Sequence, residues 1–274
     1  MCALNPSDSK GEAGSGSPGS AMDQTKPAGE KFVQDQIEAV YPLGSENHYW
    51  CLARNRIVLA EISRMLAGVD GAVLDVGCGR GFTVGFLARH GVDCYGIEPA
   101  DYSPSSADAA GRVYYGLSLQ NLPKDLRERV RVVLILDVLE HLAEPEKLLE
   151  EVRNALPGAT QLLVTLPARQ EIWSNYDVYY GHQRRYSLPN LAELAVGCDL
   201  ELVSAGYFFH ALYLPAWLMR QARIARSTVI KVPKGLFWHR LLANFFLWER
   251  KILPSAFWGT SLLATLTPRR QRDR

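Results

Sequence analysis

Several features that would assign the sequence to a class at once are missing from it. The five cysteines are odd in number and form no CxxC pair, which argues against a disulfide framework and for a reducing compartment. No apolar run approaches the ~18 residues of a membrane span, and the N-terminus lacks the basic region and apolar core of a signal peptide. The formal net charge is only +1, so bulk charge predicts no nucleic-acid partner. No cluster of His and carboxylates has metal-ligand spacing, so no metal is expected.

Composition divides the chain near residue 30. Residues 1–29 are rich in Gly, Ser, Pro and Ala and nearly free of large apolar side chains. Such a segment cannot bury enough surface to offset the entropy of ordering, so we expect it to be disordered. Residues 30–274 have the composition of one globular domain, with order beginning near Lys31.

Short apolar runs alternate with amphipathic stretches. Strands are expected at 72–76, 93–97, 113–116, 130–136, 160–166, 200–209 and 260–266. Helices are expected at about 48–67, 82–90, 145–156, 188–197, 210–226 and 235–251. The first strands are continuously apolar, which is typical of a parallel sheet covered on both faces. A polar and aromatic loop at 167–187 interrupts this alternation.

Three glycines at alternate positions follow the first expected strand: Gly77, Gly79 and Gly81. A glycine turn before a helix lets a ligand approach the backbone. The dinucleotide fingerprint GxGxxG would need a third glycine where Phe82 stands. Asp75, just before the turn, suits the ammonium group of a methionine moiety better than a pyrophosphate, which it would repel. Glu98 ends the second strand, where a carboxylate can accept hydrogen bonds from both ribose hydroxyls.

These motifs resemble the class I S-adenosylmethionine (SAM)-dependent methyltransferases. The resemblance rests on DVGCGRG at 75–81, GIEP at 96–99 and DVLEHL at 137–142, the last similar to ubiquinone-biosynthesis-like O-methyltransferases. It continues through a GHxRRY-type loop, as in a bacterial subgroup, and the closing GTSLLAT. It implies a Rossmann-like α/β fold with a seven-stranded, mostly parallel sheet. The last strand would be antiparallel, and the helical stretch 210–251 would be inserted before it.

The resemblance also implies SAM as the cofactor. Its candidate binding residues are Asp75, Gly77, Cys78, Gly79, Gly81, Glu98, Pro99, Ser118, Asp137 and Val138. The backbone or Ser118 would substitute for an acid that often binds the adenine amino group and that is missing here. The leading candidate for the catalytic base is His182, with His141 in reserve. The candidate acceptor-binding residues are Trp173, Tyr176, Arg184, Arg185 and Tyr186. A structural clasp or core packing stays open as the alternative for the loop residues.

The sequence therefore predicts methyl transfer from SAM to an oxygen or nitrogen of a small-molecule, glycan or lipid-linked acceptor. A SAM-binding protein without turnover and an NAD-dependent oxidoreductase are the alternatives, and the glycine spacing disfavours the second. Residues 210–251 carry eight Lys and Arg against one acid, Glu249, beside Trp, Phe and Leu. This composition suits peripheral contact with an anionic membrane surface, at the inner face of a membrane in an otherwise cytoplasmic protein. A pocket cap or a homodimer interface is the alternative for these helices.

Overall fold

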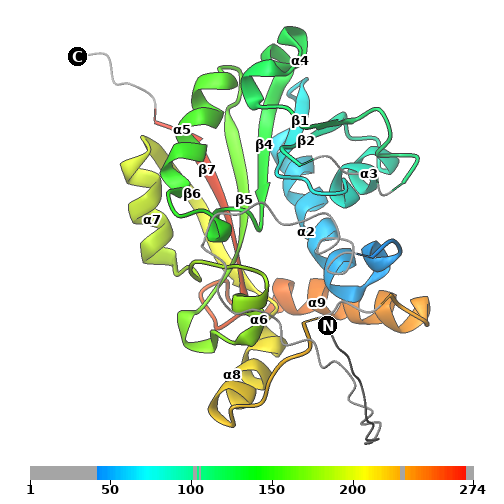
Figure 1. The fold of residues 1–274 in the computed structure, drawn as a ribbon, viewed down its shortest axis with the longest axis vertical. Coiled ribbons are helices and arrows are strands. Elements are labelled where there is room, and N and C mark those ends of the chain that lie inside the picture. Colours follow the sequence, from blue (N-terminus) through cyan, green and yellow to red (C-terminus); the bar gives the residue numbers. More distant parts are fainter. Residues whose placement is uncertain (1–41, 101–103, 105, 229–231, 270–274) are drawn as a thin grey trace, which may run out of the picture. The chain divides into compact units, whose positions relative to one another are not determined.

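The structure is a computed structural model that describes residues 42–100, 104, 106–228 and 232–269. The expected disorder of residues 1–29 and the expected start of order near Lys31 lie outside these residues. Within them, a seven-stranded sheet runs in the order β3-β2-β1-β4-β5-β7-β6, and helices cover both of its faces (Figure 1).

All seven expected strands are present. They are β1 (Ala72–Val76), β2 (Cys94–Glu98), β3 (Val113–Tyr115), β4 (Val130–Leu136), β5 (Gln161–Pro167), β6 (Leu200–Phe208) and β7 (Ser261–Pro268). Strands β1 to β5 pair in parallel, whereas β7 is antiparallel to both β5 and β6. Every residue of β1 is buried, which explains its continuous apolar run. The predicted fold class is confirmed.

The helices match the expected stretches, with two additions. They are α2 (Tyr49–Met65), α3 (Phe82–Arg89), α4 (Lys124–Arg129), α5 (Pro145–Ala155), α6 (Asn175–Tyr179), α7 (Leu188–Gly197), α8 (Tyr213–Gln221) and α9 (Leu236–Ile252). The sequence did not predict α4 and α6, and α6 lies inside the loop expected at 167–187. The expected helix at 210–226 is shorter, because α8 ends at Gln221. Helices α8 and α9 form the predicted insertion before β7.

Two apolar clusters hold the helices on the sheet. On one face, Leu149 of α5 and Leu191 of α7 are buried with the strands. On the other face, Ile57 of α2, Leu87 of α3 and Phe246 of α9 are buried together. In a doubly wound sheet whose faces are covered by helices, the ligand site lies at the carboxyl ends of the parallel strands.

Candidate active site

The turn between β1 and α3 is built from glycines in the left-handed region. Gly77, Gly79 and Gly81 have φ of 75°, 54° and 75°. A Cβ at Gly77 would lie 2.8 Å from the Val138 side chain, and one at Gly81 would lie 2.9 Å from the Val113 side chain. A Cβ at Gly79 would meet no atom of the described chain within 4 Å. Gly79 therefore borders open space at the turn, where a ligand has room to approach.

Glu98 is oriented toward this turn by two backbone donors. Its Oε2 accepts a hydrogen bond from the Gly79 N–H (2.9 Å) and its Oε1 accepts one from the Ala100 N–H (3.1 Å). Burial raises the pKa of Glu98, and the two N–H donors oppose that rise. A carboxylate has about four acceptor positions, so the two backbone bonds leave acceptor capacity for a ligand.

Asp75 is a buried acid inside β1. It is 2% exposed, and no hydrogen bond or ion pair links its carboxylate to another residue that the structure describes. Burial raises the pKa of Asp75 to about 7, although Arg54 opposes this rise. A buried carboxylate without a partner is unfavourable when ionised. A cationic ligand group beside Asp75 would therefore stabilise its ionised form.

Asp137 follows β4 in a conformation that non-glycine residues rarely adopt, with φ of 56°. Its N–H donates to the Thr165 carbonyl (2.9 Å), and its Oδ2 accepts from the Arg54 guanidinium (2.6 Å). Arg54 also donates to the Thr83 hydroxyl (3.1 Å), which donates to Asn55. These side-chain hydrogen bonds connect α2 to α3 and to the end of β4. From the sequence, helix packing is the favoured role of Arg54 over a role in a site, so only the structure shows its bond to Asp137.

A cluster of three ionisable side chains lies beyond Asp137. Glu140 and His141 lie in a short 3₁₀ turn, and His182 lies in the loop after β5. A carboxylate oxygen of Glu140 and one ring nitrogen of each histidine lie within 4.8 Å of one another. Burial, and less strongly the charge of Asp137, raise the pKa of Glu140 well above its ordinary value. Burial, and less strongly the neighbouring His182, lower the pKa of His141 to about 4. Both environments favour the neutral side chain near pH 7.

His182 is held by a buried carboxylate. Its Nδ1 lies 3.0 Å from Asp177 Oδ1, and Asp177 also accepts from Arg185 through Nε (2.7 Å) and a terminal guanidinium nitrogen (3.1 Å). Burial alone would raise the pKa of Asp177, but the His182 and Arg185 contacts lower it to about 2. An ionised Asp177 keeps the proton on Nδ1, so Nε2 of the neutral His182 ring is the nitrogen that can accept a proton.

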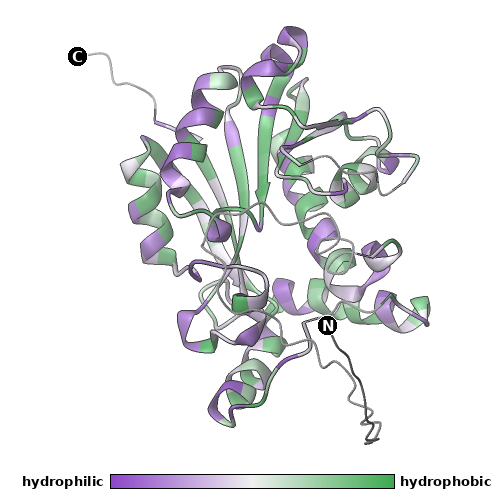
Figure 2. Cartoon of the chain, viewed as in Figure 1, coloured by the Kyte–Doolittle hydropathy of each residue, from purple (hydrophilic) through white to green (hydrophobic). Residues whose placement is uncertain are grey.

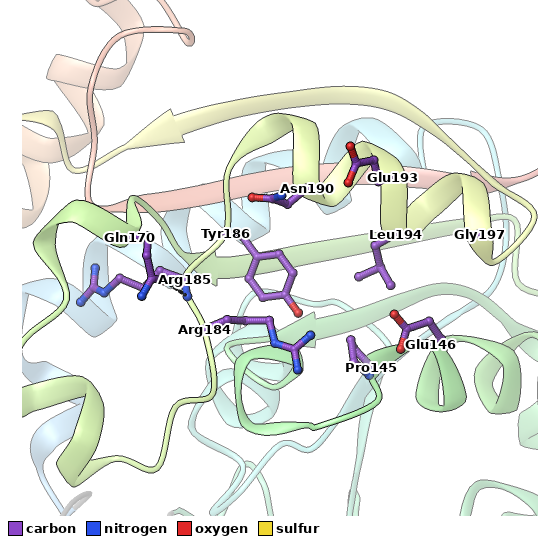
Figure 3. A pocket seen from close by; sticks show the side chains of 10 residues that line it. All are labelled: Pro145, Glu146, Gln170, Arg184, Arg185, Tyr186, Asn190, Glu193, Leu194 and Gly197. Atoms are coloured by element: carbon purple, nitrogen blue, oxygen red, sulfur yellow. Dashed lines mark hydrogen bonds between the residues drawn. The ribbon is translucent and has the colours of Figure 1, made fainter.

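The candidate acceptor-binding residues separate into two places. Trp173 and Tyr176 are half-buried, and the Tyr176 ring lies 4.3 Å from that of Tyr180 and 4.9 Å from the Arg226 guanidinium. Arg184, Arg185 and Tyr186 instead line an open hollow of about 530 Å³ between α5 and α7 (Figure 3).

The hollow between α5 and α7 is separate from the glycine turn. In Figure 3, Arg184 and Tyr186 point toward Pro145, and Arg185 points away from it. Arg184 donates to the Ala143 carbonyl (2.8 Å), and neither Asp75 nor Glu98 lines this hollow. The Arg185 guanidinium is buried against Asp177, so it is already engaged within the loop.

The remaining cofactor candidates surround the turn. The Cys78 N–H donates to the Ile97 carbonyl (3.2 Å), and Val138 packs on Gly77. Pro99 is exposed directly after Glu98, and Ser118 is exposed three residues after β3 ends. The structure thus brings the residues of the first three motifs to the carboxyl ends of β1, β2 and β4, with Ser118 beyond neighbouring β3.

A parallel sheet with an antiparallel β7, a glycine turn after β1 and an acid at the end of β2 defines a Rossmann-like ligand-binding domain of the methyltransferase type. A protein family described as "Methyltransferase domain" matches residues 49–205. The chain belongs to this methyltransferase family. The predicted family resemblance is confirmed.

Individual relatives match over less of the sequence or only in fold. The ubiquinone biosynthesis O-methyltransferase of Azorhizobium caulinodans is 43% identical over 77 residues, which are 26% of this chain and 30% of that protein. The chain therefore matches less than a third of this relative's length. The structure of the plantazolicin methyltransferase BamL, in complex with a triazolic desmethylPZN analog and SAH, superposes with a TM-score of 0.50 at 11% identity. That superposition covers 86% of this chain and 97% of BamL, and it supports the fold.

Proposed function

We propose that this chain is a SAM-dependent methyltransferase that transfers a methyl group to an oxygen, or a nitrogen, of a small-molecule, glycan or lipid-linked acceptor. The observation that carries the proposal is the placement of Asp75, Gly79 and Glu98 around one open turn in a chain of the methyltransferase family. The names of two similar proteins support it: one is a ubiquinone biosynthesis O-methyltransferase, and the other is a methyltransferase in complex with SAH.

The residues around the turn fit SAM by their chemistry. Glu98 would accept hydrogen bonds from the ribose hydroxyls with the acceptor positions that the backbone leaves. Asp75, buried and without a partner in the described chain, would pair with the ammonium group. Gly79 leaves the space that these contacts require. When bound, SAM supplies a methyl group made electrophilic by the neighbouring positive sulfur.

The Asp177–His182 pair is the proposed base for a hydroxyl acceptor. Asp177 orients the ring, and Nε2 of His182 takes the acceptor proton. Glu140 and His141 border the same point and favour their neutral forms, so neither adds a positive charge beside the protonated His182 ring. Holding the acceptor in line with the methyl group can contribute several kcal/mol, up to ~7–11.

Two measurements test the proposal against its alternatives. Calorimetry with S-adenosylhomocysteine (SAH) and with NAD identifies the ligand, and we expect SAH to bind and NAD not to bind. Methyl-labelled SAM is then incubated with the protein and with aqueous or lipid fractions of a cell extract. We expect an acceptor to gain label with the wild type and to gain less label with His182→Ala. Binding of SAH without label in any fraction would indicate a protein without turnover, and binding of NAD alone would indicate an oxidoreductase.

A further inference from the structure

The insertion before β7 leaves many large apolar side chains in solvent. On α9, Phe237 is 69% exposed, Trp238 is 65% exposed and Trp248 is 58% exposed. Further exposed apolar residues lie on α8 and in the segment after α9: Leu214, Trp217, Leu218, Phe257 and Trp258. The rings of Tyr213, at the start of α8, and of Trp258 are 5.6 Å apart, so the two segments adjoin. Large exposed apolar patches mark interaction sites.

Helix α9 is apolar on two opposite faces. Ala243 and Phe246 are buried in the cluster that includes α2. A second set recurs at spacings of three and four and is exposed throughout: Phe237, Leu241, Phe245, Trp248 and Ile252. We call this set the outer stripe. It contributes little to folding because it stays in solvent, so it needs another explanation.

Basic side chains flank the outer stripe. At 100° per residue, the exposed Arg240 and Lys251 fall along the same edge of it. Arg220, Arg223 and Lys234 are also exposed. The one acid of residues 210–258 is Glu249, which is buried and accepts the N–H groups of His210 (2.7 Å) and Ala211 (2.9 Å). The charge that the described part of the insertion exposes is therefore positive. Figure 2 shows hydrophobic and hydrophilic segments side by side along α8 and α9.

We propose that α8, α9 and residues 254–258 dock on the surface of an anionic lipid bilayer. Aromatic and Leu side chains beside Lys and Arg are the composition that places a helix in the interface plane. The outer stripe would enter the acyl boundary, and its basic edge would contact anionic head groups. A second copy of the chain presents the same positive edge, so self-pairing would bring like charges together. Among the helices that the structure describes, none has the length and hydropathy of a membrane span.

The proposed membrane face lies at the ligand end of the sheet. Helices α8 and α9 lie beyond the carboxyl ends of the parallel strands (Figure 1). The insertion also contacts the loop that carries His182: the Tyr180 hydroxyl donates to the Thr228 carbonyl (2.8 Å). If the proposed methyltransferase function holds, on which this step rests, the acceptor is a lipid or a lipid-linked group that enters the site from the bilayer.

Vesicle sedimentation tests the docking surface without any turnover. We expect the full chain to sediment with phosphatidylcholine vesicles that contain phosphatidylglycerol, and to stay in the supernatant with phosphatidylcholine alone. High salt should weaken the binding, because it screens surface charge. Replacing three exposed aromatics (Phe237→Ser, Trp238→Ser and Trp248→Ser) should lower the bound-to-free ratio at least about tenfold. The matched control, Val196→Ser with Val203→Ser, removes side chains that are 54% and 58% exposed on α7 and β6, and it should bind like the wild type.

A wild type that stays in the supernatant with both kinds of vesicle at low salt overturns the proposal, and so does binding that the triple variant retains. Light scattering that shows a dimer dissociated by the triple variant, without vesicle binding, assigns the outer stripe to self-association. Thermal unfolding and SAH binding of each variant confirm its fold. Failed vesicle binding with intact SAH binding and label transfer overturns the membrane proposal alone, whereas vesicle binding without SAH binding overturns the proposed function alone.

Discussion

Replacing Asp75 by asparagine should stabilise the protein while it weakens cofactor binding. Burial raises the pKa of Asp75 from an ordinary value of 3.8 to about 7. Because the folded-state pKa lies above the unfolded value, the folded protein binds more protons than the unfolded chain in this range. The free energy of unfolding therefore falls as the pH rises from about 4 to about 7, and then levels off. A difference of about three units, at 1.36 kcal/mol each, gives a cost of about 4 kcal/mol above pH 7.

Urea unfolding of the wild type and of Asp75→Asn at pH 5 and pH 8 measures this cost. The asparagine side chain is neutral at both values, so the stability advantage of the variant should grow by about 2–3 kcal/mol from pH 5 to pH 8. Asp70→Asn, which changes an exposed acid, should show no such growth. An Asp75→Asn advantage that is the same at both pH values would refute the reasoning.

The same substitution should have the opposite effect on ligand binding. Asp75 must lose its proton to pair with the ammonium group, so wild-type affinity for SAH should rise as the pH increases from 6 to about 7.5. Asp75→Asn should bind SAH more weakly and should lose this rise. Calorimetry that finds equal SAH affinity for the variant and the wild type would show that Asp75 contacts no cation in the complex.

Three further outcomes are expected. Glu98→Ala should lower SAH affinity by about 1.5–3 kcal/mol, because a charged acceptor is lost; calorimetry with wild-type affinity in the folded variant would contradict this. His182→Ala should remove the increase of turnover with pH that a base produces, and an unchanged rate from pH 6 to 9 would exclude the base role. Turnover should persist in EDTA, because burial raises the pKa of Glu140 and metal ligands must be deprotonated; a loss that divalent ions restore would instead assign a metal to the cluster of Glu140, His141 and His182.

The sheet is predictable from the sequence because its strands are buried on both faces. β1 and β4 have the expected bounds, since a continuous apolar run between turn residues marks such a strand directly. Helices α4 and α6 were not predicted, because six and five residues are too few for a helical period to appear. Helix α8 ends where Arg223 adopts a left-handed conformation (φ 56°) and the Ile224 N–H donates to the Met219 carbonyl (2.9 Å). Glycine is the usual residue at such a helix end, so an arginine there gives no stop signal in the sequence.

The site residues likewise divide into those with a local signal in the sequence and those that only the fold brings together. The glycine turn and Glu98 can be predicted from the sequence because each lies at the end of an apolar strand. At such a position glycines let a ligand approach the backbone, and an acid accepts hydrogen bonds from ribose hydroxyls. Arg54 reaches Asp137 across 83 residues of sequence, so only the fold brings them together. Asp177 had a local signal, since Ser174 and Asp177 form a capping box at the start of α6. The capping box predicts a helix start, and the ion pair with Arg185 is visible only in the structure.

The loop after β5 joins the candidate base to the insertion, and this connection bears on what the insertion does. The Tyr180 hydroxyl bonds to Thr228, and Asn175 bonds to Arg226, so α6 is tied to the segment that follows α8. Asp177, in the first turn of α6, holds the His182 ring through a hydrogen bond with Nδ1. A detachable membrane anchor would need no such contacts. Because α6 contacts the insertion and also carries the carboxylate that holds His182, the proposed docking of α8 and α9 on a bilayer would act on the position of the His182 ring.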